Sequence, residues 1–215
     1  MDRDGRWPDL RDTRRHLAHL GMPKMNLTPA ILENEWVRLE PMTEAHREAM
    51  RPLAADPEIW ALMTLRGDGE HFDAWFDLML ATQESGTQIS HAIFRKSTNA
   101  MVGHSSYLVI STANQRAEIG WTWYEASARG TEVNPACKLA LLGRLFECGA
   151  ERAELKTHGL NKRSQAAMLK MGAKYEGTLR RQMRTWRGDL RDTVWFSVLK
   201  EEWPTVKAGL EVRLT

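Results

Sequence analysis

Alternation of apolar and polar positions, bounded by turn residues, predicts seven β-strands in this chain. The expected strands cover 36–40, 90–95, 101–110, 116–124, 152–157, 173–184 and 190–200. Polar turns at 96–100 and 111–115 separate the second, third and fourth strands, which predicts an antiparallel meander. Arg187-Gly188-Asp189 joins the last two strands in the same way.

Apolar residues at helical spacing predict helices between these strands. The first runs from Thr43 to about Ala55 and is stopped by Asp56-Pro57. The second covers 70–84 and carries an aromatic stripe on one face, which predicts core packing. That stripe consists of Phe72, Trp75, Phe76 and Met79.

A third helix is expected at 135–148, with Leu139, Leu142 and Phe146 on its buried face. Its outer face is expected to carry Lys138, Arg144 and Glu147. The fourth helix covers 162–171 and ends at Gly172, because glycine is common just past a helix C-terminus. The order β-α-α-β-β-β-α-β-α-β-β therefore predicts one α/β domain with a mixed sheet.

The length of 215 residues suits one well-cored domain. Residues 1–24 are rich in Arg and Asp, and we expect a flexible extension or a start codon placed too far upstream, before a domain at 25–215. No apolar run approaches the ~20 residues of a membrane span, and no apolar secretory segment follows the first Met. Cys137 and Cys148 share one predicted helix, so we expect reduced thiols in a cytoplasmic protein.

The small net charge of +2 hides two segments of opposite sign. Residues 25–90 carry four Arg and no Lys against twelve acidic residues, a net charge of −8. Residues 151–200 carry twelve basic and five acidic residues, a net charge of +7. The first surface favours a cationic ligand and the second a polyanionic one, although solvated surface charge explains both equally well.

The start of the third helix is a candidate phosphate site. We expect Asn134 as its N-cap and Pro135 as its first helical residue. Unpaired N–H groups and the positive end of the helix dipole bind phosphate. The preceding Arg129-Gly130-Thr131 supplies a cation, a flexible turn and a hydroxyl. The alternative is an ordinary capped helix after a loop.

The strand at 116–124 carries a carboxylate in an otherwise apolar setting. Alternation places Glu118, Gly120 and Thr122 on one face, and Ile119, Trp121 and Trp123 on the other. Gly120 allows a bulge or a close backbone approach. A surface ion pair is the alternative explanation for Glu118.

The loop after the strand at 152–157 adds further polar groups. Asn161 is expected to cap the fourth helix and to place Ser164 in its first turn. If this strand lies beside 116–124, a ligand at one helix start also meets the other. His158 is a weaker candidate base, and a plain helix cap is the alternative for Asn161.

Together these segments resemble the GNAT superfamily of N-acetyltransferases, and within it the group of RimJ and RimL, which acetylate ribosomal proteins at the N-terminus. The resemblance extends from about Trp36 to Val206. Its carriers are Glu118-Ile119-Gly120-Trp121, Arg129-Gly130-Thr131, Val133-Asn134, Asn161 with Ser164, Met171-Gly172-Ala173, Glu176-Gly177, Leu179-Arg180, and the closing segments at 192–199 and 202–204.

The resemblance implies a GNAT-like mixed, mostly antiparallel sheet flanked by helices in a single domain. It also implies acetyl-CoA as co-substrate, no metal, and direct transfer to a primary amine without a covalent enzyme intermediate. The acceptor is then a protein N-terminus or a small-molecule amine, with no membrane or nucleic-acid partner, and the protein is a monomer or homodimer.

The same resemblance implies roles for individual residues. Glu118 removes the proton from the amine, directly or through water, and Ser164 protonates the leaving thiolate. Strand N–H groups near Trp121–Trp123 stabilise the thioester oxygen as it gains charge. The expected coenzyme-binding residues are Trp121, Trp123, Arg129, Gly130, Thr131, Val133, Asn134 and Asn161.

One departure from the superfamily pattern affects the expected phosphate loop. Glu132 and Asn134 stand where small residues are usual, and a carboxylate beside a pyrophosphate is unfavourable unless it faces solvent. One alternative is therefore a non-catalytic acyl-CoA-binding module of the same fold. A second is an RNA- or ribosome-binding protein that uses the basic segment, although no nucleic-acid motif is found. Hydrolase and Walker motifs are not found either.

Overall fold

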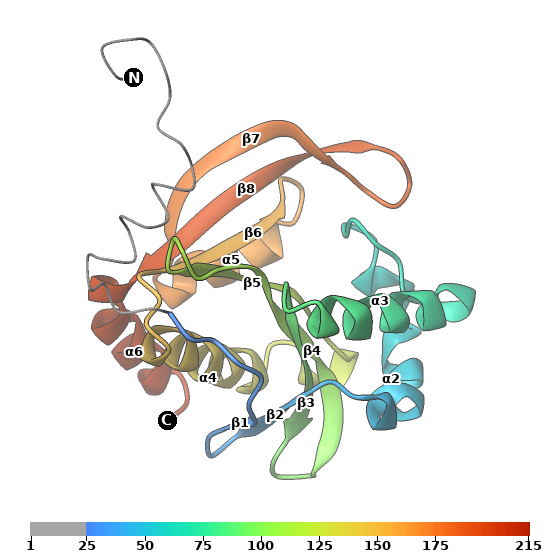
Figure 1. Ribbon diagram of the computed structural model, residues 1–215, viewed down its shortest axis with the longest axis horizontal. Coiled ribbons are helices and arrows are strands. Elements are labelled where there is room, and N and C mark those ends of the chain that lie inside the picture. Colours follow the sequence, from blue (N-terminus) through green and yellow to red (C-terminus); the bar gives the residue numbers. More distant parts are fainter. Residues whose placement is uncertain (1–24) are drawn as a thin grey trace.

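One eight-stranded sheet runs through the molecule between two groups of helices (Figure 1). The structure is a computed structural model that describes residues 25–215, so the extension predicted at 1–24 lies outside it. The strand order is β1-β2-β3-β4-β5-β6-β8-β7. Neighbouring strands are antiparallel except β5 and β6, which run parallel. The predicted mixed, mostly antiparallel sheet is thereby confirmed.

All seven predicted strands are present, with ends shifted by at most one residue. The strands are β1 (Leu32–Glu33), β2 (Val37–Pro41), β3 (Ile89–Arg95), β4 (Ala100–Ser111), β5 (Arg116–Tyr124), β6 (Arg152–His158), β7 (Lys174–Arg184) and β8 (Leu190–Leu199). The two-residue β1 was not predicted, because so short a segment carries no readable alternation.

The four predicted helices are also present, and a fifth follows the last strand. The helices are α2 (Arg47–Ala54), α3 (Phe72–Glu84), α4 (Val133–Glu147), α5 (Lys162–Met171) and α6 (Trp203–Val212). Short 3₁₀ turns are η1 (Glu44–His46), η2 (Pro57–Ile59), η3 (Gly69–His71), η4 (Ala126–Ala128) and η5 (Lys200–Glu202). The sequence analysis missed α6, although Pro204 suits a first helical turn and Val206 and Leu210 are buried four residues apart.

The start of α4 differs from the prediction. The helix begins at Val133 with Glu132 in the N-cap position, so Asn134 lies inside the first turn and does not cap the helix. Lys138, expected on the outer face, is only 9% exposed. The buried face of the helix carries Lys138, Leu141, Leu142 and Leu145, and Leu139 is only partly buried.

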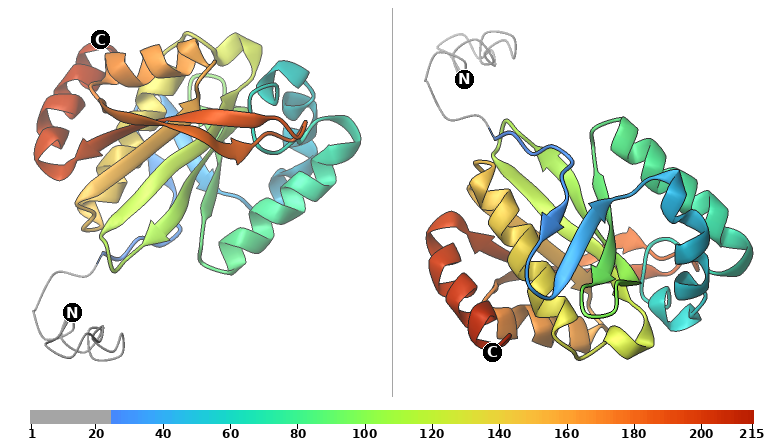
Figure 2. Two further views of the ribbon diagram at one scale, coloured as in Figure 1. Left: turned by 90° about the horizontal axis from the view of Figure 1, so that it is seen from above. Right: turned by 90° about the horizontal axis from the view of Figure 1, so that it is seen from below.

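Helices α4, α5 and α6 cover one face of the sheet (Figure 2). Leu141, Leu142 and Leu145 of α4 are fully buried there. They belong to one apolar cluster with strand residues such as Ile119 and Phe196. Burial of this continuous apolar surface is the main source of stability in the fold.

Helices α2 and α3 lie on the other face of the sheet (Figure 2). The predicted stripe of α3 is buried there, which confirms its core role. Its Trp75 ring packs against Trp60 and Trp123, with ring centroids 5.2 and 6.0 Å away. This aromatic cluster borders the region where β5 and β6 meet.

Two further expectations concern the thiols and the membrane. Cys137 and Cys148 are both free cysteines, as expected. No helix within residues 25–215 is long and apolar enough to span a membrane. A cytoplasmic location stays a prediction.

Candidate functional site

Strands β5 and β6 diverge in the middle of the sheet. Their parallel pairing joins Arg116–Glu118 to Arg152–Glu154 and ends there. Strand β5 nevertheless continues to Tyr124 and β6 to His158. Beyond these pairs the facing edges of β5 and β6 do not pair with each other. The backbone N–H and C=O groups on these edges can therefore bind a ligand.

A β-bulge in β5 lies beside this opening. Ser106 pairs with Gly120 but His104 pairs with Trp123, so β5 contains one extra residue between these pairs. Trp121 has a φ of 52°, which is rare for a residue with a side chain. The His104 ring atom Nδ1 lies 2.9 Å from the Trp121 carbonyl oxygen. The bulge allowed by Gly120 is thus confirmed.

The bulge also corrects the predicted alternation of β5. Ile119 packs in the cluster under α4, whereas Trp123 packs in the aromatic cluster beside α3. The prediction that Ile119 and Trp123 share one face is therefore wrong, because the extra residue reverses the alternation. The Trp121 side chain stays partly exposed beside Glu118, while that of Trp123 is buried.

Glu118 is the last β5 residue paired with β6, and it is only 2% exposed. Its Oε2 atom lies 2.8 Å from the Nζ atom of Lys156 on β6. A Cβ atom at Gly120 would lie 2.8 Å from the Oε1 atom of Glu118, so glycine leaves room for the carboxylate. Burial raises the pKa of Glu118 above its usual value, although the positive charge of Lys156 opposes this shift.

A cavity of about 600 Å³ opens over Glu118. Its lining comes from β4, β5, β6 and the residues before β3, and includes Gln88, Leu108, Ile110, Glu118, Trp121 and Lys156. Apolar walls with a few charged groups, here Glu118, Lys156 and Arg116, are typical of a small-ligand site. The predicted base Glu118 therefore lines a cavity. It does form an ion pair, but this pair with Lys156 is buried and does not lie on the surface.

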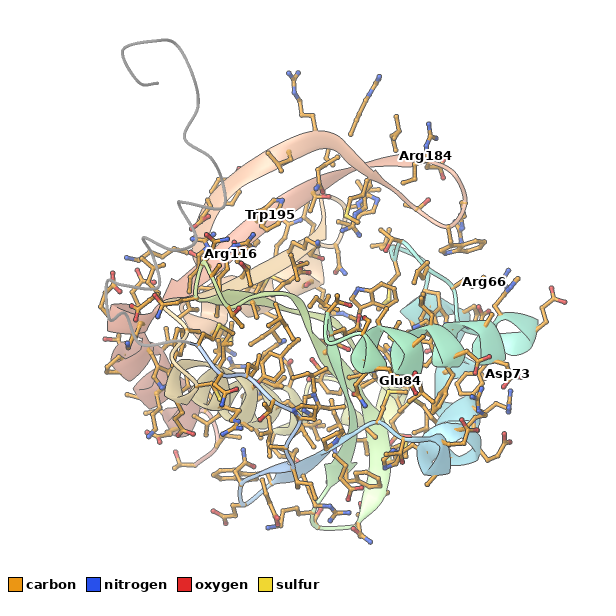
Figure 3. The ribbon with its side chains drawn as sticks, in the orientation of Figure 1. Arg66, Asp73, Glu84, Arg116, Arg184 and Trp195 are labelled. Carbon is orange, nitrogen blue, oxygen red and sulfur yellow. The ribbon has the colours of Figure 1, made fainter. Side chains whose placement is uncertain are left out.

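The β7–β8 hairpin extends from this region toward the segment between α2 and α3. Trp186 donates from Nε1 to the Trp60 carbonyl oxygen at 2.9 Å, and Arg191 donates to the Leu62 carbonyl oxygen at 3.2 Å. Figure 3 shows Arg184 near the hairpin tip and Arg66 on the facing segment. The hairpin is thereby anchored on the same side of the sheet as α3.

The loop before α4 holds the predicted phosphate-binding residues. Gly130 has a φ of 77°, and a Cβ atom there would have no neighbour within 4 Å. The Thr131 hydroxyl accepts hydrogen bonds from the Val133 amide (3.3 Å) and from Arg95 (3.1 Å). Arg95 Nε also lies 3.2 Å from the Glu132 carboxylate. The carboxylate that departs from the family pattern is thus paired with a cation.

Two other predicted coenzyme ligands have partners within the protein. Arg129 donates to the Asp56 carboxylate at 2.6 Å and to the Tyr124 carbonyl oxygen at 2.9 Å. The Asn134 side-chain oxygen accepts from the Tyr124 hydroxyl at 3.2 Å. Their polar atoms therefore shape the loop around the start of α4.

The start of α5 agrees with the prediction. The Asn161 side-chain oxygen accepts a hydrogen bond from the Ser164 amide at 3.0 Å, so Asn161 caps the helix. Ser164 is half-buried in the first turn. The Nδ1 atom of His158 accepts from the Leu160 amide at 3.0 Å, and burial lowers the pKa of this histidine. His158 is thus tied to its own loop.

Three polar residues near β5 were not recognised as site residues in the sequence analysis. Lys156 belongs to the site because it pairs with Glu118. It lies two residues after Glu154 and therefore on the same face of β6, which the strand pattern could have shown. The Nζ atom of Lys138 lies 3.3 Å from the Thr122 hydroxyl, and burial lowers the pKa of this lysine to about 8. His104 could not be recognised from the sequence, because it is linked to the site only by its contact with the Trp121 carbonyl oxygen in the bulge. Residues 25–215 contain no cluster of His, Cys, Asp and Glu that can hold a metal ion.

Comparisons with known proteins define the class. The family model for the acetyltransferase (GNAT) domain matches residues 37–174. A solved structure from T. thermophilus, assigned as an acetyltransferase, is 33% identical, with a TM-score of 0.79 over 89% of this chain and 100% of that one. No curated protein matches the chain. The chain is therefore an acetyltransferase.

Within that class the chain belongs to the GNAT family, whose acetyltransferases use acetyl-CoA. Mycobacterium smegmatis RimJ, in complex with CoA-disulfide, is 19% identical, with a TM-score of 0.72 over 86% of this chain and 97% of its own. A Salmonella typhimurium acetyl transferase that modifies the N-terminal serine of ribosomal protein L7/L12 is 21% identical, with a TM-score of 0.70 over 79% and 99%. At these low sequence identities, the two similarities show a shared fold and nothing more.

Proposed function

We propose that the protein moves the acetyl group of acetyl-CoA directly to a primary amine. The observation that carries this proposal is the position of Glu118. It is a buried carboxylate at the point where β5 and β6 part, facing a cavity of about 600 Å³. A base with a raised pKa beside an open strand edge suits proton removal from an amine that attacks a thioester.

In the proposed reaction the amine nitrogen forms a bond to the acetyl carbon, and the bond from that carbon to sulfur breaks. Glu118 accepts the proton that the amine loses, and Lys156, 2.8 Å away, balances the charge of the carboxylate before this transfer. The amine leaves as an amide, and coenzyme A leaves as a thiolate that takes a proton from water or from Ser164, which regains one from water, while Glu118 returns its proton to solvent. A free thiol has a pKa of ~8.5, so this last proton matters less than positioning.

Backbone N–H groups of Trp121–Trp123 are proposed to bind the thioester oxygen. They belong to the part of β5 that follows the bulge and has no ladder to β6. Donors held rigidly at the place where negative charge develops are the strongest contribution in acyl transfer. The Trp123 side chain is buried in the aromatic cluster, so we propose that it supports this segment of β5 by packing.

The loop at 129–134 and the start of α4 fit the phosphates of acetyl-CoA. Gly130 keeps the approach open, and the first amides of a 15-residue helix supply donors. Arg95 neutralises Glu132, which removes the main electrostatic objection to a phosphate there. Thr131, Val133 and Asn134 would hold the phosphates, and Asn161 would hold the pantetheine arm. Arg129, paired with Asp56, is proposed to shape this loop.

The acceptor is proposed to be a protein N-terminus or a small-molecule amine. An α-amino group has a reference pKa of ~8 and a lysine amine ~10.4, so the first needs less help from Glu118. The neighbour from Salmonella typhimurium acts on an N-terminal serine, and its fold is shared. A monomer or homodimer remains the proposed state.

One experiment tests this function. Purified protein is incubated with acetyl-CoA and a panel of amines (N-terminal peptides, polyamines, aminoglycosides and amino acids), and release of the coenzyme A thiol is followed. Release that depends on an acceptor and is lost in Glu118→Gln supports the proposal. The matched control is Glu176→Gln, which removes an ion-paired carboxylate on β7, outside the cavity lining.

The control variant is expected to keep turnover within a few-fold of the wild type. Acetyl-CoA binding without release on any amine would instead support the non-catalytic module. No binding at all would contradict the proposed phosphate site at α4.

A further inference from the structure

A chain of buried polar side chains connects the cavity to the bulge in β5. Gln88, which lines the cavity, donates from its amide nitrogen to the Ser90 hydroxyl at 2.7 Å. The Ser90 and Ser106 hydroxyls lie 3.1 Å apart, and Ser106 lies 3.3 Å from Nε2 of His104. The other ring nitrogen of His104 reaches the Trp121 carbonyl oxygen at 2.9 Å. The chain therefore ends on the backbone of the bulge.

The direction of these hydrogen bonds determines the form of the His104 ring. A carbonyl oxygen can only accept, so Nδ1 must carry the hydrogen in the bond to Trp121. In the neutral ring Nε2 then accepts, and the Ser106 hydroxyl is the group that donates to it. Gln88 donates to Ser90, so Ser90 can donate to Ser106 and Ser106 to His104, and each group has one partner to accept from and one to donate to. The ring is thus a neutral imidazole with its hydrogen on Nδ1.

The surroundings of His104 favour this neutral form. The residue is fully buried, and burial lowers the pKa of its imidazole to about 4. The Trp123 ring stacks on it with a centroid distance of 6.0 Å, and Trp75 meets it edge-on at 5.2 Å. No ion pair of His104 exists within residues 25–215. The ring is therefore a weak base, and its Nε2 atom is already engaged by the Ser106 hydroxyl.

The backbone at Trp121 needs a donor in this position. A φ of 52° is unfavourable for an L-residue and persists only where the surroundings hold it. The extra residue interrupts the ladder between β4 and β5, so its carbonyl oxygen requires a partner from a side chain. His104, which pairs with Trp123 at one end of the bulge, supplies that partner from β4.

We propose that His104 is a positioning residue for acetyl transfer: its Nδ1–H bond to the Trp121 carbonyl holds the β5 bulge in the geometry that presents strand N–H groups to the thioester oxygen. This role rests on the proposed function. It differs from a packing role in the aromatic cluster, because it depends on one hydrogen atom at one ring position.

A matched pair of variants separates these roles. The amide nitrogen of asparagine is attached at the same branch point as Nδ1 of histidine, whereas that of glutamine corresponds to Nε2. His104→Asn can keep the bond to Trp121, and His104→Gln cannot place a donor there. We expect His104→Asn to keep kcat within about 3-fold of the wild type and His104→Gln to lose about 10- to 100-fold. The melting temperature and the Kd for acetyl-CoA are measured for both.

If the wild type is active and both variants lose kcat equally, the positioning role is overturned. His104 would then act only by packing in the aromatic cluster. No acceptor-dependent thiol release from the wild type would overturn the proposed function, and this role with it. ¹⁵N NMR of the wild type gives an answer even where His104→Gln does not fold. We expect a neutral ring protonated at Nδ1 from about pH 5.5 to about 8.5, and protonation at Nε2 instead would overturn the proposal.

Discussion

The two faces of the sheet are built in different ways. Under α4, α5 and α6, one continuous apolar cluster fills the space between helices and strands. On the face of α2 and α3, tryptophans surround a buried polar chain, and the cavity over Glu118 adjoins them. The first face is mostly apolar packing, although it also buries His91 against Tyr107 and the amine of Lys138, while the second buries the Glu118 carboxylate beside a cavity and the polar chain that ends at His104.

This difference indicates which face provides stability and which provides chemistry. Buried ionisable groups cost free energy unless they are paired, so a fold keeps them where their charge or hydrogen bonds are used. Glu118 has one cationic partner, and His104 supports a strained backbone position. Substitutions on the two faces should therefore affect different measurements.

The largest expected effect belongs to Glu118 on the cavity face. Glu118→Gln should lower kcat about 10²-fold or more, because general base catalysis contributes about that much. In the wild type, kcat/KM should rise with pH as Glu118 loses its proton, with an apparent pKa above the usual glutamate value because burial raises it. A pH–rate profile from about pH 4 to about 8 measures this limb, and an unchanged acid limb in the variant would contradict the assignment.

On the other face, Leu141→Ala should act on stability alone. Leu141 is fully buried in the cluster under α4, so the variant should lose about 3 kcal/mol of unfolding free energy. Chemical denaturation measures this loss, and kcat per folded molecule should stay unchanged. Leu139→Ala on the same helix is the control, since that side chain is only partly buried. A large fall in kcat for Leu141→Ala would break the separation between the faces.

Lys138 is a buried amine on the apolar face and offers a sharper test. Burial lowers its pKa to about 8, so the folded state binds its proton less well than the unfolded state. Wild-type stability should therefore rise with pH between about 8 and 10.4, where only the unfolded chain still holds that proton. Lys138→Met should be more stable than wild type at pH 7 by up to about 3 kcal/mol.

The difference between the two proteins should shrink as pH rises to about 10, and denaturation curves at about pH 7, 8.5 and 10 measure it. A constant difference would show that Lys138 keeps its ordinary pKa. A variant that is stable but inactive would show that this amine, 3.3 Å from the Thr122 hydroxyl, takes part in the reaction.

Local patterns were sufficient for most of the fold. Alternation predicted β5 at its observed bounds, and Gly172 marked the end of α5. The same alternation failed at Trp121, because Gly120 only allows a bulge, whereas the position of the extra residue depends on pairing with β4. Burial of Lys138 was missed for a related reason, since it depends on contact with Thr122 of β5, which helical spacing does not show.

Within the site, single residues were predictable and their partners were not. Glu118 stood out as a carboxylate in an apolar strand, and Asn161 as a helix cap. The pairing of Arg129 with Asp56 joins residues 73 positions apart, so no local pattern predicts it. Charge counts have the same limit. Many acids of the negative segment 25–90 are paired with arginines across α2 and α3, which the net charge of −8 does not reveal.

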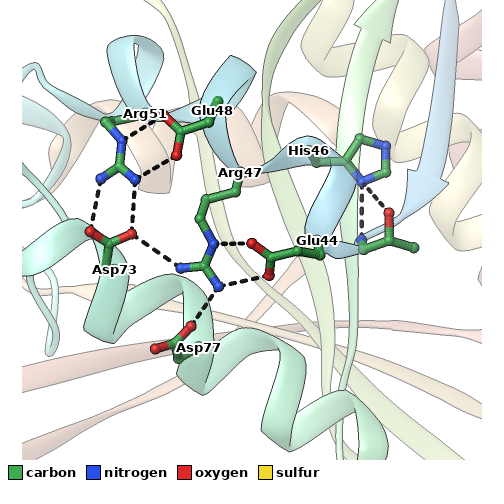
Figure 4. A network of polar contacts seen from close by, with 8 residues as sticks. Glu44, His46, Arg47, Glu48, Arg51, Asp73 and Asp77 are labelled. Atoms are coloured by element: carbon green, nitrogen blue, oxygen red, sulfur yellow. Dashed lines mark hydrogen bonds and ion pairs between the residues drawn. The ribbon is translucent and has the colours of Figure 1, made fainter.

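Arg47 gives the smallest expected effect and tests this pairing. Its guanidinium group contacts the carboxylates of Glu44 (2.5 Å), Asp77 (2.6 Å) and Asp73 (3.1 Å), which joins α2 to α3 (Figure 4). It also lies over the Phe76 ring, 4.4 Å from the centroid. Arg47→Met keeps an apolar stem over that ring and removes the charge.

The expected loss for Arg47→Met is below about 1 kcal/mol, because solvent screens exposed ion pairs and ordering them costs entropy. Denaturation at about 0.05 and 1 M NaCl measures it, and the loss should shrink at high salt because the Debye length falls to about 3 Å. A loss that salt does not change would mean that Arg47 acts through contact with Phe76. The charged network beside the aromatic cluster would then contribute packing, as the apolar face does, and the two faces would be stabilised in the same way.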